Sequence, residues 1–320
     1  MPDPSIETAD LSKRYGRITA LVGLSMRVER GSIFGFLGPN GAGKTTAVKL
    51  LLGLARPTSG EARVLGAPIS DERAHRDARA RVGYLPELFR YQGWLTAREV
   101  LASHCALARM GRPAWAREIA VALDTVGLAD RADDRVQTYS KGMQQRLGLG
   151  VALLGAPELV LLDEPTSALD PVGRHDVREI VRSLRSRGTT VFLNSHLLSE
   201  VEQVCDRVAV VDHGRVIAMG ALSELLRSDT VRVRAAGLTD DTRAALARSG
   251  YALDGDGDRF VIRAIDLDRV PALVDSLVAS GARVYAVEPL HETLEERFLA
   301  LLAAAPKGIG EADAEKKEQR

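Results

Sequence analysis

The chain has 320 residues and a mass of 34.5 kDa, enough for about two domains of roughly 150 residues each. Its 43 Lys and Arg residues balance its 43 Asp and Glu residues, which argues against a protein whose main task is to coat nucleic acid or anionic lipid. The two cysteines, Cys105 and Cys205, are far apart in sequence. They exclude a disulfide framework and indicate a reducing compartment.

No segment of the sequence predicts a membrane span. The most apolar stretch, residues 147–162, is interrupted by Pro157 and Glu158 and is shorter than the roughly 18 apolar residues that a span needs. The first ten residues are acidic and have no apolar run, so we expect no signal peptide. Any role at a membrane is therefore expected to depend on a partner.

The first 225 residues alternate short apolar runs with helical patterns and Gly-rich turns, which predicts an α/β domain. Runs rich in Val, Ile, Leu and Phe are typical of parallel strands that are covered on both faces. Such strands are predicted at 33–37, 159–162, 191–193 and 208–211, with helices at 45–54 and 171–187.

Residues 226–305 have a different pattern and predict an accessory α+β domain. Strands are expected at 231–234, 251–253, 260–263 and 283–287, with helices at 240–249 and 266–280. This β-α-β-β-α-β order is that of a ferredoxin-like domain.

A last helix is predicted over 291–304, with Leu294, Phe298, Leu301 and Leu302 on one face. We expect this face to pack on the sheet of its own domain, with an interface to a partner as the alternative. Residues 306–320 contain four acidic and four basic residues and no aromatic one, which predicts a disordered charged tail.

One segment carries a phosphate-binding pattern, because it fits G-x-x-x-x-G-K-[ST] between an expected strand and an expected helix. Glycines let backbone N–H groups surround phosphate oxygens, and the helix N-terminus adds partial positive charge. The lysine should reach the terminal phosphates and the first threonine hydroxyl should bind Mg²⁺. A turn without a ligand is the alternative, which the strand, loop and helix in register disfavour. The loop consists of Gly38, Pro39, Asn40, Gly41, Ala42, Gly43, Lys44, Thr45 and Thr46.

Two acidic residues, Asp163 and Glu164, follow the expected strand at 159–162. At the carboxyl edge of an open sheet, acids lie where such sheets bind ligands. We expect Asp163 to hold Mg²⁺ and Glu164 to polarise the water that attacks the γ-phosphate. Alone, an Asp-Glu pair is more often a solvated turn, but a phosphate loop in the same chain favours the catalytic interpretation.

Three further segments make the pattern specific: residues 139–146 (Tyr-Ser-Lys-Gly-Met-Gln-Gln-Arg), 167–170 (Ser-Ala-Leu-Asp) and 194–196 (Asn-Ser-His). In this order, together with the phosphate loop and the two acids, they resemble the nucleotide-binding domain of ATP-binding-cassette (ABC) transporters. The resemblance covers about residues 5–220.

The resemblance implies a role for each matching position. Residues 38–46 match the Walker A loop, Asp163 the Walker B aspartate and Glu164 the catalytic glutamate. Residues 140–144 match the ABC signature, in which Ser140 and Gly142 approach the γ-phosphate. Asp170 lies in the D-loop, His196 matches the switch histidine that contacts the γ-phosphate, and Tyr15 the aromatic residue that stacks on adenine.

Two positions depart from the family pattern. Lys141 and Met143 replace family residues in the signature, so Met143 is given no role. Glu87 stands where the family usually has a glutamine. A carboxylate is also an oxygen donor for Mg²⁺, so Glu87 is predicted as a metal ligand that adds negative charge. These features resemble the branch that serves multidrug, ion, haem and polysaccharide exporters, which has a similar extra C-terminal domain.

Four of the 14 aromatic residues, Tyr84, Phe89, Tyr91 and Trp94, lie within eleven positions. Either they form a small local core or they contact a partner. The resemblance favours the second interpretation, because the helical subdomain that follows, about 88–135, receives the membrane subunit in this family. The other five histidines (His75, His104, His175, His213 and His291) show no metal-ligand spacing.

The resemblance implies an ATPase that binds ATP and Mg²⁺, in which two copies, or one copy and a close paralogue, dimerise around two ATP molecules. They would power a separate integral membrane permease, as an exporter, at the cytoplasmic face of the membrane. A soluble ABC ATPase acting on ribosomes or DNA is the alternative. It is disfavoured by the single phosphate loop, by the 94 residues between Lys44 and Tyr139, and by the zero net charge, so no nucleic-acid partner is expected. A small-molecule kinase would not need the signature or His196.

Overall fold

The computed structural model describes residues 3–167, 169–226, 230–255, 257–263, 265–290 and 293–304. They form two compact units: the residues up to Leu222 with those from Phe298 on, and the residues between Ser223 and Arg297. The boundary predicted from the sequence lies near residue 225, with the whole last helix in the second domain. In the structure, Phe298 and the later residues of that helix group with the first unit instead. The tail predicted for 306–320 lies outside the described residues.

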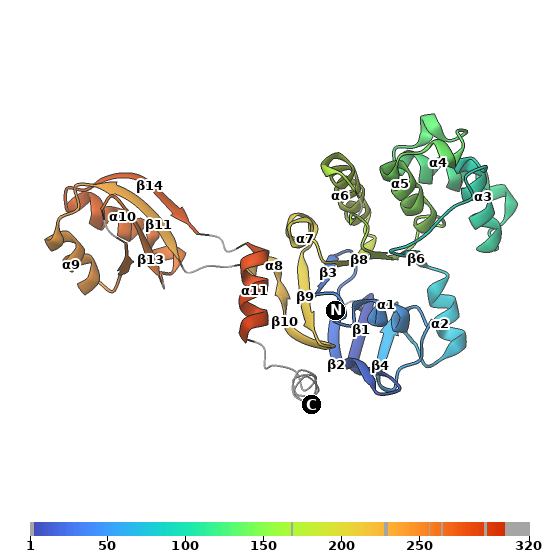
Figure 1. The fold of residues 1–320 in the computed structure, drawn as a ribbon, viewed down its shortest axis with the longest axis horizontal. Helices are drawn as coiled ribbons and strands as arrows, with labels where there is room; N and C mark the ends of the chain where they lie inside the picture. The colour runs from blue at the N-terminus through green and yellow to red at the C-terminus, as the bar shows by residue number, and fades with distance from the viewer. Residues whose placement is uncertain are drawn as a thin grey trace, which may run out of the picture. The chain divides into compact units, whose positions relative to one another are not determined.

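A six-stranded sheet forms the centre of the first unit, in the order β10-β9-β3-β8-β7-β6, and β10 alone is antiparallel to its neighbour (Figure 1). Every residue of β3, β7 and β8 is buried, as expected for parallel strands covered on both faces. The four predicted strands correspond to β3, β7, β8 and β9. The bounds are β3 (Ile33–Leu37), β6 (Val82–Leu85), β7 (Leu159–Asp163), β8 (Thr190–Ser195), β9 (Arg207–Asp212) and β10 (Arg215–Ala221).

A second, antiparallel sheet has the order β2-β1-β4-β5, and the sequence analysis did not predict it. Between the two sheets, Leu50 and Leu51 of helix α1 pack with Leu11 and Leu24 of the antiparallel sheet and Phe192 of the parallel one. This shared core holds α1, and the loop before it, in a fixed place. The strands are β1 (Ile6–Tyr15), β2 (Ile18–Val28), β4 (Ser59–Val64) and β5 (Ala67–Pro68).

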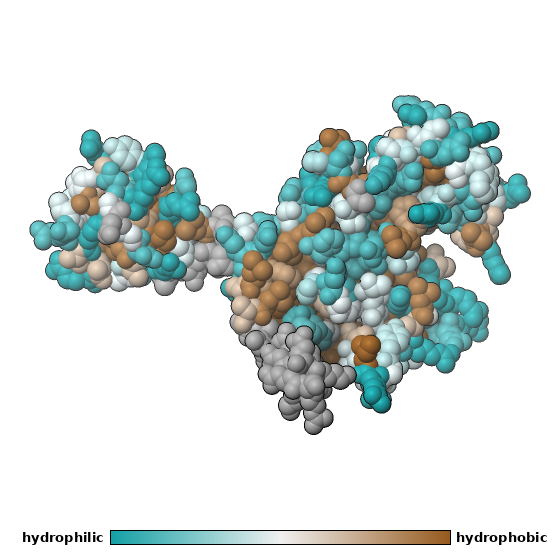
Figure 2. Space-filling view, in the orientation of Figure 1, coloured by the Kyte–Doolittle hydropathy of each residue, from teal (hydrophilic) through white to brown (hydrophobic). Residues whose placement is uncertain are grey.

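Helices of this unit cover the sheets and form a separate helical group (Figure 1). Figure 2 shows mainly hydrophilic surface over the helical group and over α2, and hydrophobic residues gathered around α11 and β10. The predicted subdomain at 88–135 contains α3 and α4, and α5, which contacts both, extends the group beyond residue 135. The helices are α1 (Lys44–Leu51), α2 (Glu72–Arg79), α3 (Ala97–Leu107), α4 (Trp115–Thr125), α5 (Lys141–Ala152), α6 (Pro171–Ser186) and α7 (Leu198–Val204), with short 3-10 turns at Arg112–Ala114, Ala129–Arg131 and Val136–Thr138. Helix α8 (Leu222–Leu225) begins at the boundary between the two units.

The second unit has the strand order β12-β13-β11-β14 with antiparallel pairing throughout. Together with the β-α-β-β-α-β chain order, this is the predicted ferredoxin-like arrangement. The elements are β11 (Val231–Ala236), α9 (Asp240–Arg248), β12 (Ala252–Asp254), β13 (Arg259–Arg263), a 3-10 turn (Leu267–Arg269), α10 (Val270–Ala279) and β14 (Arg283–Pro289). The last helix, α11 (Leu294–Ala304), is divided between the two units at Phe298.

The approach of β6 to α5 generates a first prediction. A Cβ atom at Gly83 would collide with the backbone oxygen of Ala152, so Gly83→Ala must push strand and helix apart. We expect a loss of about 1–3 kcal/mol in the free energy of unfolding, measured by urea denaturation. Gly111→Ala is the control, because Gly111 has φ −61° and open space around its Cα. Equal stability of the two variants would contradict this packing.

Candidate functional site

The phosphate loop connects the carboxyl end of β3 to the first turn of α1. Gly43 has φ 101°, and a Cβ there would collide with the backbone oxygen of Ala20. A Cβ at Gly38 would collide with the backbone oxygen of Val211. Both positions therefore need glycine, and the first-turn N–H groups of α1, which have no partner within the helix, are left to bind an anion.

The side chain of Lys44 lies along this loop and is 8% exposed. Its Nζ donates to the carbonyl oxygen of Gly38 at 2.8 Å and to that of Pro39 at 3.3 Å. Burial lowers the pKa of Lys44, although the nearby charges of Glu164, Asp163 and Glu87 act in the opposite direction. The structure thus places a cation among three acidic residues at the mouth of the loop.

Strand register brings the two acids to this loop. Asp163 ends β7 and pairs with Asn194 of β8, while Leu37 of β3 pairs with Ser195. The Asn194 amide donates a hydrogen bond to the Asp163 carboxylate. Burial nevertheless raises the pKa of Asp163, because this hydrogen bond offsets only part of the desolvation. The sequence analysis quoted Asn194 but missed this contact.

Glu164 is held by β8 through both its backbone and its side chain. Its φ is +53°, and its N–H donates to the carbonyl oxygen of Asn194 at 2.8 Å. Its Oε2 lies 2.7 Å from Nδ1 of His196, a hydrogen-bond distance. The Glu164 side chain is 7% exposed and that of His196 is 45% exposed. The carboxylate is therefore fixed at the sheet edge by a partly exposed imidazole.

These groups line one open cavity of about 310 Å³. It brings together Asn40, Gly41, Gly43, Lys44, Thr45, Thr46, Glu87, Asp163, Glu164 and His196 with Asn194 and residues 18–20. Residues 18–20 (Ile-Thr-Ala) were missed by the sequence analysis, since nothing in their type indicates a ligand. Tyr15 pairs with Ile18 across the β1–β2 hairpin but is not among the lining residues, and the Lys13 ammonium lies 4.7 Å from its ring centroid.

The oxygen donors of this cavity fit Mg²⁺ bound together with a phosphate. Among the described residues, no group of three or more His, Cys, Asp or Glu could hold a metal by itself. The Thr45 hydroxyl and the Asp163 and Glu87 carboxylates do line the same cavity, and Mg²⁺ typically takes one or two protein oxygens plus substrate phosphates. The Asn194 Oδ1 atom, buried and without a hydrogen-bond partner, adds an unused acceptor at the cavity wall.

The other predicted nucleotide contacts lie in a different cavity, of about 320 Å³, at the first turns of α5 and α6. Ser140, Gly142 and Asp170 line it, and none of them lines the phosphate-loop cavity. Ser140 caps α5 by accepting from the N–H of Met143 at 3.2 Å, and Asp170 caps α6 by accepting from that of Gly173 at 2.7 Å. One chain thus presents two separate sets of predicted contacts.

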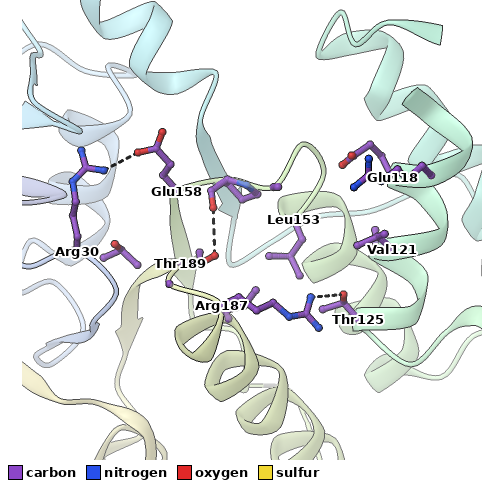
Figure 3. A pocket seen from close by; sticks show the side chains of 15 residues that line it. Arg30, Glu118, Val121, Thr125, Leu153, Glu158, Arg187 and Thr189 are labelled. Atoms are coloured by element: carbon purple, nitrogen blue, oxygen red, sulfur yellow. Dashed lines mark hydrogen bonds and ion pairs between the residues drawn. The ribbon is translucent and has the colours of Figure 1, made fainter. Parts of the chain in front are cut away.

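A third cavity, of about 400 Å³, lies at the opposite, amino ends of β7 and β8 and contains none of the predicted site residues (Figure 3). Arg30 bonds Glu158 at 2.8 Å, and the guanidinium of Arg187 donates to the Thr125 hydroxyl at 3.2 Å. Arg187 follows α6 and Thr125 ends α4, so this contact ties the helical group to the central unit.

The four aromatic residues around Glu87 divide into half-buried and exposed members. Phe89 and Tyr91 contact one another, with ring centroids 5.3 Å apart, and burial raises the pKa of Tyr91. Tyr84 packs against the central core. Phe89 and Tyr91 thus form a small local contact and Tyr84 belongs to the central core, while all three remain half-buried, so contact of this segment with a partner stays a prediction. Trp94 is 70% exposed and is the most open of the four.

Comparisons with known proteins identify the family that this chain resembles. A sequence model of the ABC transporter family matches residues 21–167. Nod factor export ATP-binding protein I of Paraburkholderia xenovorans is 42% identical, over 72% of this chain and 75% of that protein. The daunorubicin/doxorubicin resistance ATP-binding protein DrrA of Streptomyces peucetius is 38% identical, over 94% of this chain and 93% of that protein.

A solved ATP-binding subunit of an ABC transporter superposes with a TM-score of 0.62 at 30% identity, covering 69% of this chain and 92% of that one. In the part of the chain that the structure describes, no helix is long and apolar enough to cross a bilayer.

The position of Lys44 predicts its contribution to nucleotide binding. Lys44→Ala removes the cation beside the loop, and a charged hydrogen bond contributes about 1.5–3 kcal/mol. ATP affinity should fall roughly 10–100-fold, measured by fluorescence titration with a nucleotide analogue. Lys49→Ala is the control, because Lys49 is an exposed residue of the same helix. Unchanged affinity in Lys44→Ala would refute the assigned role.

Proposed function

We propose, from the premise that this chain belongs to the family of ABC transporter ATP-binding proteins, that it works as two copies around two ATP molecules and drives export through a separate membrane permease. ATP binding and hydrolysis come with the family. The symmetric dimer, the residue roles, the permease and the direction of transport are the proposal.

The observation that carries the dimer is the separation of the two cavities. The groups suited to phosphates and metal line one cavity, and Ser140, Gly142 and Asp170 line another. If both sets contact the same nucleotide, the second set must come from another molecule. A two-fold dimer then makes two equivalent sites, each with the loop of one copy and the signature of the other. A close paralogue in place of the second copy would satisfy the same geometry.

In each proposed site, different residues bind the phosphates, the attacking water, the metal ion and the adenine. The N–H groups of the loop and Lys44 bind the β- and γ-phosphates. Glu164, held by His196 at 2.7 Å, accepts a proton from the attacking water, and His196 contacts the γ-phosphate. Thr45, Asp163 and Glu87 would hold Mg²⁺, which neutralises phosphate charge when bound. Tyr15, next to the cavity-lining hairpin residues, stacks on the adenine.

The proposal of a permease and of export rests on the relatives and on the surface of the helical group. One relative is named for Nod factor export and another for resistance to daunorubicin and doxorubicin. Exposed Trp94 and Leu88 precede α3, and exposed aromatic residues are enriched where proteins meet. We place the subunit at the cytoplasmic face of the membrane, bound through its permease, with no nucleic acid involved.

The chemical role of Glu164 predicts a separation of binding from hydrolysis. Glu164→Gln keeps the shape of the side chain but removes the base, so ATP turnover should fall roughly 10²–10⁴-fold while ATP affinity is retained. Turnover is measured by phosphate release and affinity by titration. The exposed Glu179→Gln in α6 is the control. Near-wild-type turnover in Glu164→Gln would exclude this residue as the base.

Assembly is tested on the same variant. Glu164→Gln with Mg·ATP should sediment as a dimer, and the nucleotide-free protein as a monomer. Adding Gly142→Phe should abolish the dimer but not ATP binding, because a Cβ at Gly142 meets only Ser140 Oγ, at 3.9 Å, within its own chain. Equal masses with and without ATP would contradict the proposed sandwich.

A further inference from the structure

The sheet of the second unit has one covered and one open face. Val231, Val233, Phe260 and Ile262 face a core that includes Leu246 of α9 and Leu273 of α10. The alternate residues of the same strands point the other way, and they include four arginines: Arg232 and Arg234 on β11, and Arg259 and Arg263 on β13. The open face therefore concentrates positive charge on rigid strands.

This open face is hollowed into a cavity of about 660 Å³, which is within the usual range for small-molecule sites. Arg232, Arg234 and Arg259 line it, with Val261 and Ala286 as small apolar residues between them. Asp254 and Glu288 also line it. Guanidinium groups standing over an apolar floor suit a ligand with an anionic group and an apolar body.

The pairing of β11 with β13 places two arginines side by side, which costs free energy of folding. Arg234 of β11 lies directly opposite Arg259 of β13, and like charges in directly opposite positions destabilise a sheet. Among the described residues neither of them forms an ion pair with a carboxylate. Arg234 makes a cation–π contact with the Tyr285 ring at 5.5 Å. This weak contact is the gain that the fold obtains from the two arginines, whereas an anion between their guanidinium groups would relieve the repulsion.

The nearby carboxylates do not balance the arginines. Arg263 bonds Asp254 at 2.8 Å, which neutralises that carboxylate. Glu288 pairs in register with Arg232, but no ion pair joins their side chains. Among the described residues, three arginines then face one remaining carboxylate, which leaves an excess of two positive charges. Arginine forks bind carboxylate and phosphate oxygens in pairs.

We propose that this cavity binds a small dianion with an apolar body, either a phosphate monoester or a dicarboxylate, between Arg234 and Arg259. The site is independent of the ATP site and lies in the unit that lacks the phosphate loop. It makes the second unit a ligand-binding domain of the subunit.

The test uses the full chain with its ATP site saturated by Mg·ADP. Phenyl phosphate and phthalate are titrated separately by isothermal calorimetry, so the tighter binder identifies the phosphate or the dicarboxylate class. At least one should bind, and Arg259→Gln should weaken it tenfold or more. Arg248→Gln on α9, outside the cavity, is the control and should bind like the wild type.

The unfolding temperature distinguishes a ligand-binding role of Arg259 from a structural one. Without ligand, Arg259→Gln should unfold at the same temperature as the wild type or higher, because a like-charge contact is removed. An unfolding temperature below the wild type would make Arg259 a structural residue and overturn the proposal. So would the absence of binding by both probes, binding unaffected by Arg259→Gln, or binding of a single-stranded oligonucleotide without binding of either small dianion.

Discussion

The register of three parallel strands, β3, β8 and β7, fixes where the phosphate loop, the two acids and His196 lie. Leu37 stands beside Ser195, and Asn194 beside Asp163, so the phosphate loop, His196 and the two acids leave the sheet at one edge. A slip of one residue would turn each side chain of a strand to the opposite face. The continuous burial of these strands holds the register, and the chemistry depends on it.

The second set of nucleotide contacts depends on helix ends instead. Ser140 and Asp170 cap α5 and α6, helices of 12 and 16 residues whose N-termini carry partial positive charge. Both residues therefore have a structural role in the isolated chain, where a hydroxyl or carboxylate satisfies first-turn N–H groups. Both residues also line a cavity separate from that of the phosphate loop. In the proposed dimer, the same helix N-termini therefore contact the nucleotide of the other copy.

The elements predicted correctly from the sequence are those that a pattern of neighbouring residues identifies. Strands β3, β7, β8 and β9 were found because each is an uninterrupted apolar run. Strands β1 and β2 were missed because the register shifts in β1, near Asp10 with φ +50°, break the alternation that identifies half-buried strands. The bond from Asn194 to Asp163 joins residues 31 positions apart and needs the strand order to be known. The contact between Phe89 and Tyr91, and the grouping of the end of α11 with the first unit, also depend on the tertiary structure.

The most direct test of the central claim, that one chain supplies two halves of different sites, is a cross-link between copies. Asn40→Cys lies in the phosphate loop and Lys141→Cys in the signature, and both native cysteines are buried. The two single variants, each also carrying Glu164→Gln, are mixed and oxidised with and without Mg·ATP. The account predicts a disulfide-linked heterodimer that requires both variants and ATP. A mixture that stays monomeric with ATP bound, or links equally well without it, would contradict the account.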